Sequence, residues 1–239
     1  MAKLGTILQT VPSEIRTSSS TQETVLGAHA ETPDGRGFRY VLNGATALIP
    51  GTLVQSAAET TAHQALTPTA AAVGDTSLTV TLGGTAAEVD EYKDGFAITS
   101  PGPVGEMYGI AGHPYAAASA AVVLTLSEPI KTAIPAGTLI DLVRNPYRQV
   151  VINPTTPTGS PVGVALHAIA ASQFGWLQTH GPVAVLAIGA LVVGTHVTGT
   201  DTAGAVASNT AFTTATPIVG VALTGVATSE YGAVYLTLD

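Results

Sequence analysis

The amino-acid sequence predicts an all-β protein, and three observations favour that class. The chain of 239 residues is 46% hydrophobic but only 5% aromatic, so small and β-branched residues supply most of its apolar content. It contains 26 Gly and 15 Pro, residues that punctuate short strands with turns. It also contains an internal repeat of strand–turn–strand form. We therefore expect a β-barrel or β-sandwich core and no long helix.

The first 37 residues are predicted to form an extended N-terminal arm. Residues 17–21 are all Ser or Thr, and residues 32–35 have the turn-forming sequence Thr-Pro-Asp-Gly. Little hydrophobic periodicity surrounds them, which is typical of a segment outside a packed core.

Two stretches, residues 38–67 and 147–239, are expected to build one barrel-like core domain. Residues 38–42 are strand-like and end at Asn43-Gly44, a tight-turn signal. The same kind of pattern resumes where the second stretch begins. The chain between them, residues 68–146, is therefore predicted to be an inserted β-rich domain.

The inserted domain begins with a clear strand pattern. Leu78, Val80 and Leu82 alternate with threonines, which is the period of a half-buried strand. Further strands are expected at residues 96–99, 107–111, 122–126 and 139–143.

One short helix is predicted in the inserted domain, over residues 86–93. Thr85 and Glu88 have the spacing of a capping box, and Gly95 occupies the position of a C-terminal cap.

The internal repeat lies in the core domain. Residues 163–175 align without gaps on residues 220–232, and 7 of the 13 pairs are identical. The shorter sequences at 51–54, 137–140 and 189–192 resemble one another and are each expected to open a strand. Related strands in related positions favour a closed barrel or a sandwich.

The sequence carries no recognisable catalytic or metal-binding motif. The histidines never approach a spacing such as His-x-x-x-His, and there is no cysteine. The nucleophile-elbow, dinucleotide-binding and phosphate-loop patterns are missing as well. We therefore predict no catalytic residue, no cofactor and no metal. The histidines are His29, His63, His113, His167, His180 and His196.

Two features invite a functional interpretation but favour a structural one. Glu88, Asp90, Glu91 and Asp94 could supply oxygen ligands to calcium, yet Lys93 lies among them, so a solvated helix face is expected.

The single tryptophan, Trp176, could stack on a carbohydrate. Its position two residues after Phe174 favours a core anchor instead.

Charge excludes some partners. The net charge is −8, and no Lys or Arg follows Arg148, so a nucleic-acid-binding surface is not expected. Residues 1–9 lack the apolar core of a signal peptide, and the longest apolar stretch, residues 182–194, is shorter than the roughly 20 residues of a membrane-spanning helix. No membrane partner is expected. Because charged residues are only 10% of the chain, we expect part of the surface to be buried against other subunits.

Several sequence blocks resemble the capsid decoration, or cement, proteins of tailed bacteriophages. The resemblance covers residues 38–239 and omits the arm. The blocks are Phe38-Arg39-Tyr40, residues 51–54, Gly95-Phe96, residues 108–113, Asn145-Pro146-Tyr147, residues 174–186 with Gly189, Gly194 and Gly204 after them, and residues 218–223.

The resemblance implies a β-rich structural protein that is made in the host cytoplasm and is located on the outer capsid surface of the virion. Its partners would be the major capsid protein and itself, as a homotrimer, and it would carry no catalytic residues.

Three alternatives compete with this interpretation. The first is a carbohydrate- or host-surface-binding virion module that uses Trp176 or Tyr115. The second is a hydrolase on a β scaffold, in which His and an acid or Ser converge. The third, a major capsid protein, is disfavoured because no segment has the periodicity of a long spine helix.

Overall fold

The computed structural model describes residues 8–9, 12–100, 105–209 and 217–239. The predicted all-β class is confirmed: in this described part, the helical segments are two short 3-10 turns, η1 (Glu14–Arg16) and η2 (Thr61–His63). The described part contains no helix with the length and hydropathy of a membrane span. The chain divides into a first unit, Met1–Ala58 with Pro146–Asp239, and an inserted unit, Glu59–Asn145.

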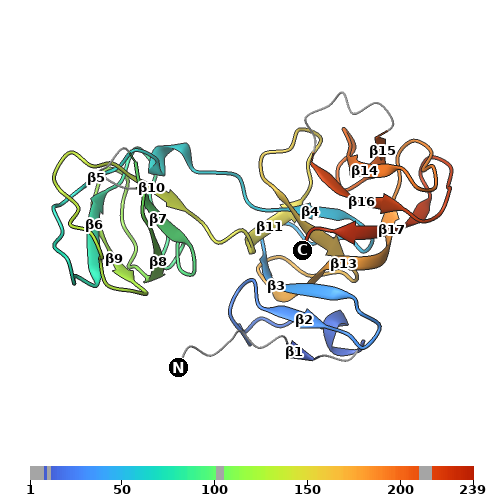
Figure 1. The fold of residues 1–239 in the computed structure, drawn as a ribbon, viewed down its shortest axis with the longest axis horizontal. Helices are drawn as coiled ribbons and strands as arrows, with labels where there is room; N and C mark the ends of the chain where they lie inside the picture. The colour runs from blue at the N-terminus through green and yellow to red at the C-terminus, as the bar shows by residue number, and fades with distance from the viewer. Residues whose placement is uncertain (1–7, 10–11, 101–104, 210–216) are drawn as a thin grey trace. The chain divides into compact units, whose positions relative to one another are not determined.

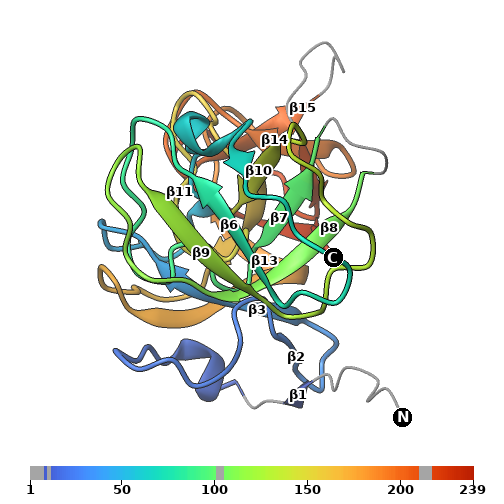
Figure 2. The same ribbon diagram turned by 90° about the vertical axis from the view of Figure 1, so that its left-hand side faces the viewer.

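The inserted unit is a closed β-barrel (Figures 1 and 2). Its sheet has the order β10-β7-β8-β9-β6-β5, and the backbones of Leu66 and Ile140 close the ring with two hydrogen bonds of 2.9 Å. The predicted insertion began at residue 68, but the unit begins at Glu59 because Leu66 belongs to this closure. The strands are β5 (Thr67–Pro68), β6 (Ser77–Thr81), β7 (Phe96–Thr99), β8 (Met107–Gly112), β9 (Ala121–Leu126) and β10 (Ile140–Val143).

The predicted alternation within the inserted unit is confirmed. Leu78 and Val80 of β6 point into one apolar core, as do Val122, Leu124 and Leu126 of β9. The two strands pair antiparallel in register, Leu78 opposite Leu124, so one face of the sheet is buried along its length.

The predicted helix over residues 86–93 is wrong. The segment forms successive turns, and Asp90 and Asp94 adopt φ angles of 57° and 62°, which a right-handed helix cannot contain. The Glu91 carboxylate accepts a hydrogen bond from the Glu88 amide at 3.0 Å, so these acids stabilise a turn instead of a helix face.

The first unit contains two rings of strands that share one long strand, β13 (Phe174–Leu186). The first ring has the order β3-β11-β4-β12-β13, and β13 closes it by pairing with β3. The second has the order β13-β17-β16-β14-β15, and a bridge from Ala187 to Val206 returns it to the end of β13. Figure 1 shows β13 beside β3 along one part and beside β17 along another.

Each ring encloses its own apolar core. Val41, Val54 and Leu177 lie in the first core, and Val185, Val197 and Leu236 lie in the second. The remaining strands of the first unit are β1 (Leu8–Gln9), β2 (His29–Glu31), β3 (Gly37–Asn43), β4 (Leu53–Gln55), β11 (Arg148–Ile152), β12 (Pro161–Ala165), β14 (His196–Gly199), β15 (Val206–Asn209), β16 (Ile218–Ala222) and β17 (Tyr231–Thr237).

One loop design recurs throughout both units, and we call its examples the paired loops. In each, a single residue forms an antiparallel bridge with the equivalent residue of a second loop, and the residue three positions later has a positive φ. The four bridges are Leu48–Ile169, Leu191–Val226, Ala71–Ile134 and Ala87–Ala116.

The positive-φ residue turns the chain back toward the barrel. It is Gly51, Ser172, Gly194, Ser229, Gly74, Gly137, Asp90 or Ser119, with φ between 57° and 95°. Gly is free of the Cβ clash that disfavours this region, which explains its use at half of these positions. In the second ring, the amides of Gly194 and Ser229 donate to the carbonyls of Ala222 and Ala187 at 2.9 and 2.8 Å.

The sequence repeat corresponds to two members of this set. Residues 163–175 and 220–232 each contain the end of a strand, a paired loop and the start of the next strand. The sequences at 51–54 and 137–140 mark the same turn, but the one at 189–192 does not open a strand. Leu191 is a bridge residue, and Gly194 is the equivalent of Gly51.

Residues 12–37 do not form the extended arm that was predicted. Ile15 of η1 is fully buried, with Ala30 of β2 and Phe38 of β3, in a small apolar cluster of the first unit. β2 pairs antiparallel with β3. The high Ser and Thr content of this segment predicted neither the burial of Ile15 nor the short strand β2.

We predict that Gly194→Ala lowers the free energy of unfolding of the first unit by about 1 kcal/mol. Nothing lies within 4 Å of an added Cβ, so the expected loss comes from the φ of +80° alone. Urea unfolding followed by the fluorescence of Trp176, which lies in this unit, measures it.

Gly225→Ala is the matched control in the partner loop. Gly225 has no positive φ, an added Cβ meets only ordinary contacts from 3.5 Å, and its counterpart before Leu191 is already Ala190. We expect unchanged or slightly higher stability. Equal losses in the two variants would contradict the assigned role of the positive φ.

Candidate functional site

The inserted unit holds a buried polar cluster around Tyr92. The Tyr92 hydroxyl lies 2.5 Å from Nδ1 of His63, whose Nε2 lies 2.9 Å from the Thr85 carbonyl. The Tyr92 amide donates to Nε2 of His113 at 3.0 Å, and Nδ1 of His113 lies 2.9 Å from the Pro114 carbonyl. Every nitrogen of both imidazoles therefore has a partner in the Tyr92 hydroxyl or the backbone, and no nitrogen remains to activate a serine.

An ion pair next to Tyr92 joins the two ends of the inserted unit. Arg144 donates to the carboxylate of Glu91 and to the Thr60 hydroxyl. Its guanidinium also lies 5.9 Å from the centre of the Tyr92 ring. Thr60 and Arg144 lie near the first and last residues of this unit, so the cluster holds its entering and leaving segments together.

Electrostatics agrees with a structural role for Tyr92. Burial, reinforced by the neighbouring Glu91 carboxylate, raises the pKa of Tyr92 to about 12, even though Arg144 and the Thr60 hydroxyl lower it. The phenol therefore stays protonated across the physiological range and serves as a fixed hydrogen-bonding group.

The acidic cluster predicted from the sequence does not converge on one point. Glu91 binds Arg144 and the Glu88 amide, whereas Asp90 accepts a hydrogen bond from the His113 amide at 2.9 Å. Within the described ranges, no group of three or more His, Cys, Asp or Glu side chains could hold a metal ion.

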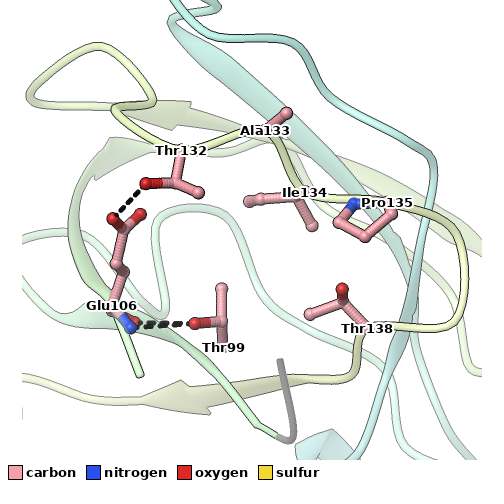
Figure 3. A pocket seen from close by; sticks show the side chains of 7 residues that line it. All are labelled: Thr99, Glu106, Thr132, Ala133, Ile134, Pro135 and Thr138. Carbon is pink, nitrogen blue, oxygen red and sulfur yellow. Dashed lines mark hydrogen bonds between the residues drawn. The ribbon is translucent and has the colours of Figure 1, made fainter. Parts of the chain in front are cut away.

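A second polar site in the inserted unit is a small cavity of about 10 Å³ beside Glu106 (Figure 3). The Glu106 carboxylate accepts a hydrogen bond from the Thr132 hydroxyl at 2.7 Å, and the Glu106 amide donates to the Thr99 hydroxyl at 2.9 Å. The Tyr108 hydroxyl donates to the same carboxylate. A cavity of this size holds at most one water molecule, so it does not fit a substrate.

Trp176 packs in the first unit as a structural residue. It contacts the Ile15, Ala30 and Phe38 cluster, and its ring meets the Tyr40 ring edge-on at 5.0 Å. The interpretation of Trp176 as a core anchor agrees with these contacts. Tyr115, the other candidate for carbohydrate stacking, is 54% exposed.

A cleft in the first unit has a volume of about 380 Å³. Arg16, Arg36, Leu166, Gln178, Pro182 and Tyr231 are among its lining residues. His167 follows Leu166, and burial lowers the pKa of His167, with the positive charge of Arg16 adding to the effect.

Sequence reasoning missed this cleft. Both arginines come from the segment assigned to an extended arm, and Gln178 sits inside a strand whose sequence contains no ligand-binding motif. The one available signal was that two of only eight basic residues lie within 21 positions of each other near the N-terminus.

Comparison with known proteins returned no match among family models, curated proteins or solved structures.

We predict that Glu91→Gln destabilises the inserted unit by about 3 kcal/mol, because it leaves the partly buried Arg144 charge without its carboxylate. Faster hydrogen exchange in β6 and β9 than in the wild-type chain would report it. The control is Lys131→Gln, which breaks the exposed pair with Glu128 at 2.7 Å and should change stability by less than about 1 kcal/mol. Similar exchange rates in the two variants would argue that the Arg144–Glu91 ion pair does not hold the two ends of the inserted unit together.

Tyr92 also predicts a pH dependence. Unfolded tyrosine loses its proton near pH 10, whereas folded Tyr92 retains it up to about pH 12. The stabilisation is therefore complete below pH 10 and is lost as pH rises toward 12, by about 2 kcal/mol. Urea unfolding by circular dichroism should show this slope in wild type, and Tyr92→Phe should reduce it. Trp176 fluorescence serves as reference for the first unit, and an unchanged slope in Tyr92→Phe would refute the assignment.

Proposed function

We propose that this protein is a structural component of a tailed-phage virion, a decoration protein that binds the outer surface of the capsid shell and stabilises it. One observation supports the proposal most strongly: in each of the four loop pairs, one loop carries an exposed aliphatic side chain just after its bridge residue. The resemblance of residues 38–239 to capsid decoration proteins supports it independently.

The exposed aliphatic residues recur at equivalent places. They follow the bridge residues by one or two positions and are 51–65% exposed: Ile49, Val73, Val89, Val192 and Val193. Single exposed apolar residues are ordinary on protein surfaces. Their recurrence in one loop design, on a chain with only 10% charged residues, favours surfaces that other subunits cover.

Stabilisation would follow from binding linkage. A protein that binds the assembled shell and not its separated subunits lowers the free energy of the shell. At a free concentration about 100 times the dissociation constant, each occupied site contributes about 2.7 kcal/mol. A homotrimer would place several loop tips on neighbouring capsid subunits at once, so that their contacts act together.

A carbohydrate- or host-surface-binding role is the second candidate, because Tyr115 presents an exposed aromatic ring next to the Ala116 bridge. Glycan-array binding by wild type that Tyr115→Ala abolishes would favour it.

We predict that the purified chain co-sediments with shells assembled from the major capsid protein of the same genome and raises their melting temperature. Val192→Asp with Val193→Asp should weaken this binding at least about tenfold by placing charge in an apolar contact. The control is Val25→Asp with Glu31→Gln. It removes an exposed apolar side chain that lies away from the paired loops and leaves the net charge of the chain unchanged. If the wild-type chain stays in the supernatant both with shells that have expanded during maturation and with shells that have not, the proposal is excluded.

A further inference from the structure

The cleft of the first unit lies where β13 passes from one ring to the other. Pairing with β3 ends at His180, and pairing with β17 begins at the same residue. Gly181 follows with a φ of +84°, and then comes Pro182, which has no amide hydrogen. The strand therefore bends at this point, and the cleft opens beside the bend.

Two side chains close over glycines to form walls of the cleft. A Cβ on Gly181 would lie 3.1 Å from Cγ of Arg36, and a Cβ on Gly51 would lie 2.5 Å from Cε1 of Tyr231. The glycines thus allow Arg36 and Tyr231 to lie directly against the backbone.

Gln178 supplies a buried acceptor that no described group satisfies. Its side-chain nitrogen donates to the carbonyls of His180 and Pro182, both at 2.9 Å, which fixes the orientation of the amide. Its Oε1 is buried and has no hydrogen-bond partner in the described part of the chain, although Gln178 is 0% exposed and lines the cleft. A buried acceptor of this kind is unfavourable unless a donor reaches it.

Arg16 and Arg36 place positive charge at the same cleft. Arg36 uses Nε for Asp34, at 2.8 Å, so its two terminal nitrogens are further donors. A guanidinium matches the geometry of a carboxylate and binds it through paired hydrogen bonds.

We propose that this cleft binds a polypeptide segment with a carboxylate side chain. The carboxylate binds Arg16 and Arg36, a backbone N–H of the segment donates to Oε1 of Gln178, and Leu166 and Pro182 contact its aliphatic carbons. A sulfate or halide ion would offer no donor to Gln178. A nucleic acid would meet a chain of net charge −8.

Isothermal titration of the isolated full-length chain tests this with blocked tetrapeptides. The probes are acetyl-Ala-Glu-Ala-Gly-amide, its Gln counterpart, the same acidic peptide with N-methylated backbone, and free glutarate. We expect the acidic peptide to bind about tenfold more tightly than the Gln peptide. The N-methylated peptide should lose about fivefold, because it lacks the donor for Gln178.

Variants assign the binding to the cleft. Arg16→Gln and Arg36→Gln should each weaken the acidic peptide about tenfold, whereas Lys131→Gln, which removes the same charge from the inserted unit, should leave it unchanged. Equal affinity for the acidic and Gln peptides, equal loss in all three variants, or no binding would overturn the proposal. Glutarate binding as tightly as the peptide would overturn the polypeptide ligand. The test needs no capsid shell, so its outcome is independent of the proposed function.

Discussion

The paired loops are the constraint on which the rest of the structure depends. At the end of each barrel, loops must connect one strand to the next. A single bridge between two such loops holds them together and pairs their backbone N–H and C=O groups. In the first ring, Leu48 donates to Ile169 at 2.9 Å and both side chains are buried. The positive φ three residues later then directs the chain into the next strand. One local geometry thus closes the ends of three rings built from different sequences.

The shared strand β13 connects this geometry to the cleft. A strand that belongs to two rings must change partners, and at His180 it exchanges β3 for β17. The bend that follows is held by the Gln178 amide, whose two donors satisfy neighbouring carbonyls and whose oxygen is left over. The buried, unpartnered oxygen of Gln178 is therefore a consequence of the way in which two rings share β13.

The polar clusters of the inserted unit have a different character. Tyr92, His63 and His113 satisfy one another and the backbone, and Arg144 with Glu91 joins the two ends of the unit. Groups engaged in this way stabilise a fold and leave no free base or nucleophile among them. The proposed capsid role has a separate basis, the exposed aliphatic side chains of the paired loops.

Local sequence determined the fold class and most strands, because period-2 alternation such as Leu78 and Val80 depends only on neighbouring residues. It also revealed the repeat, since Ile169 and Val226 occupy equivalent loops. Tertiary structure decided the rest. The turns at Asp90 and Asp94 replaced a helix because the backbone of His113 and the Ile110 carbonyl of β8 bond to them. Ile15 is buried because Phe38 lies beside it. The cleft joins Arg16 to Gln178 across long sequence separation, which no local pattern encodes.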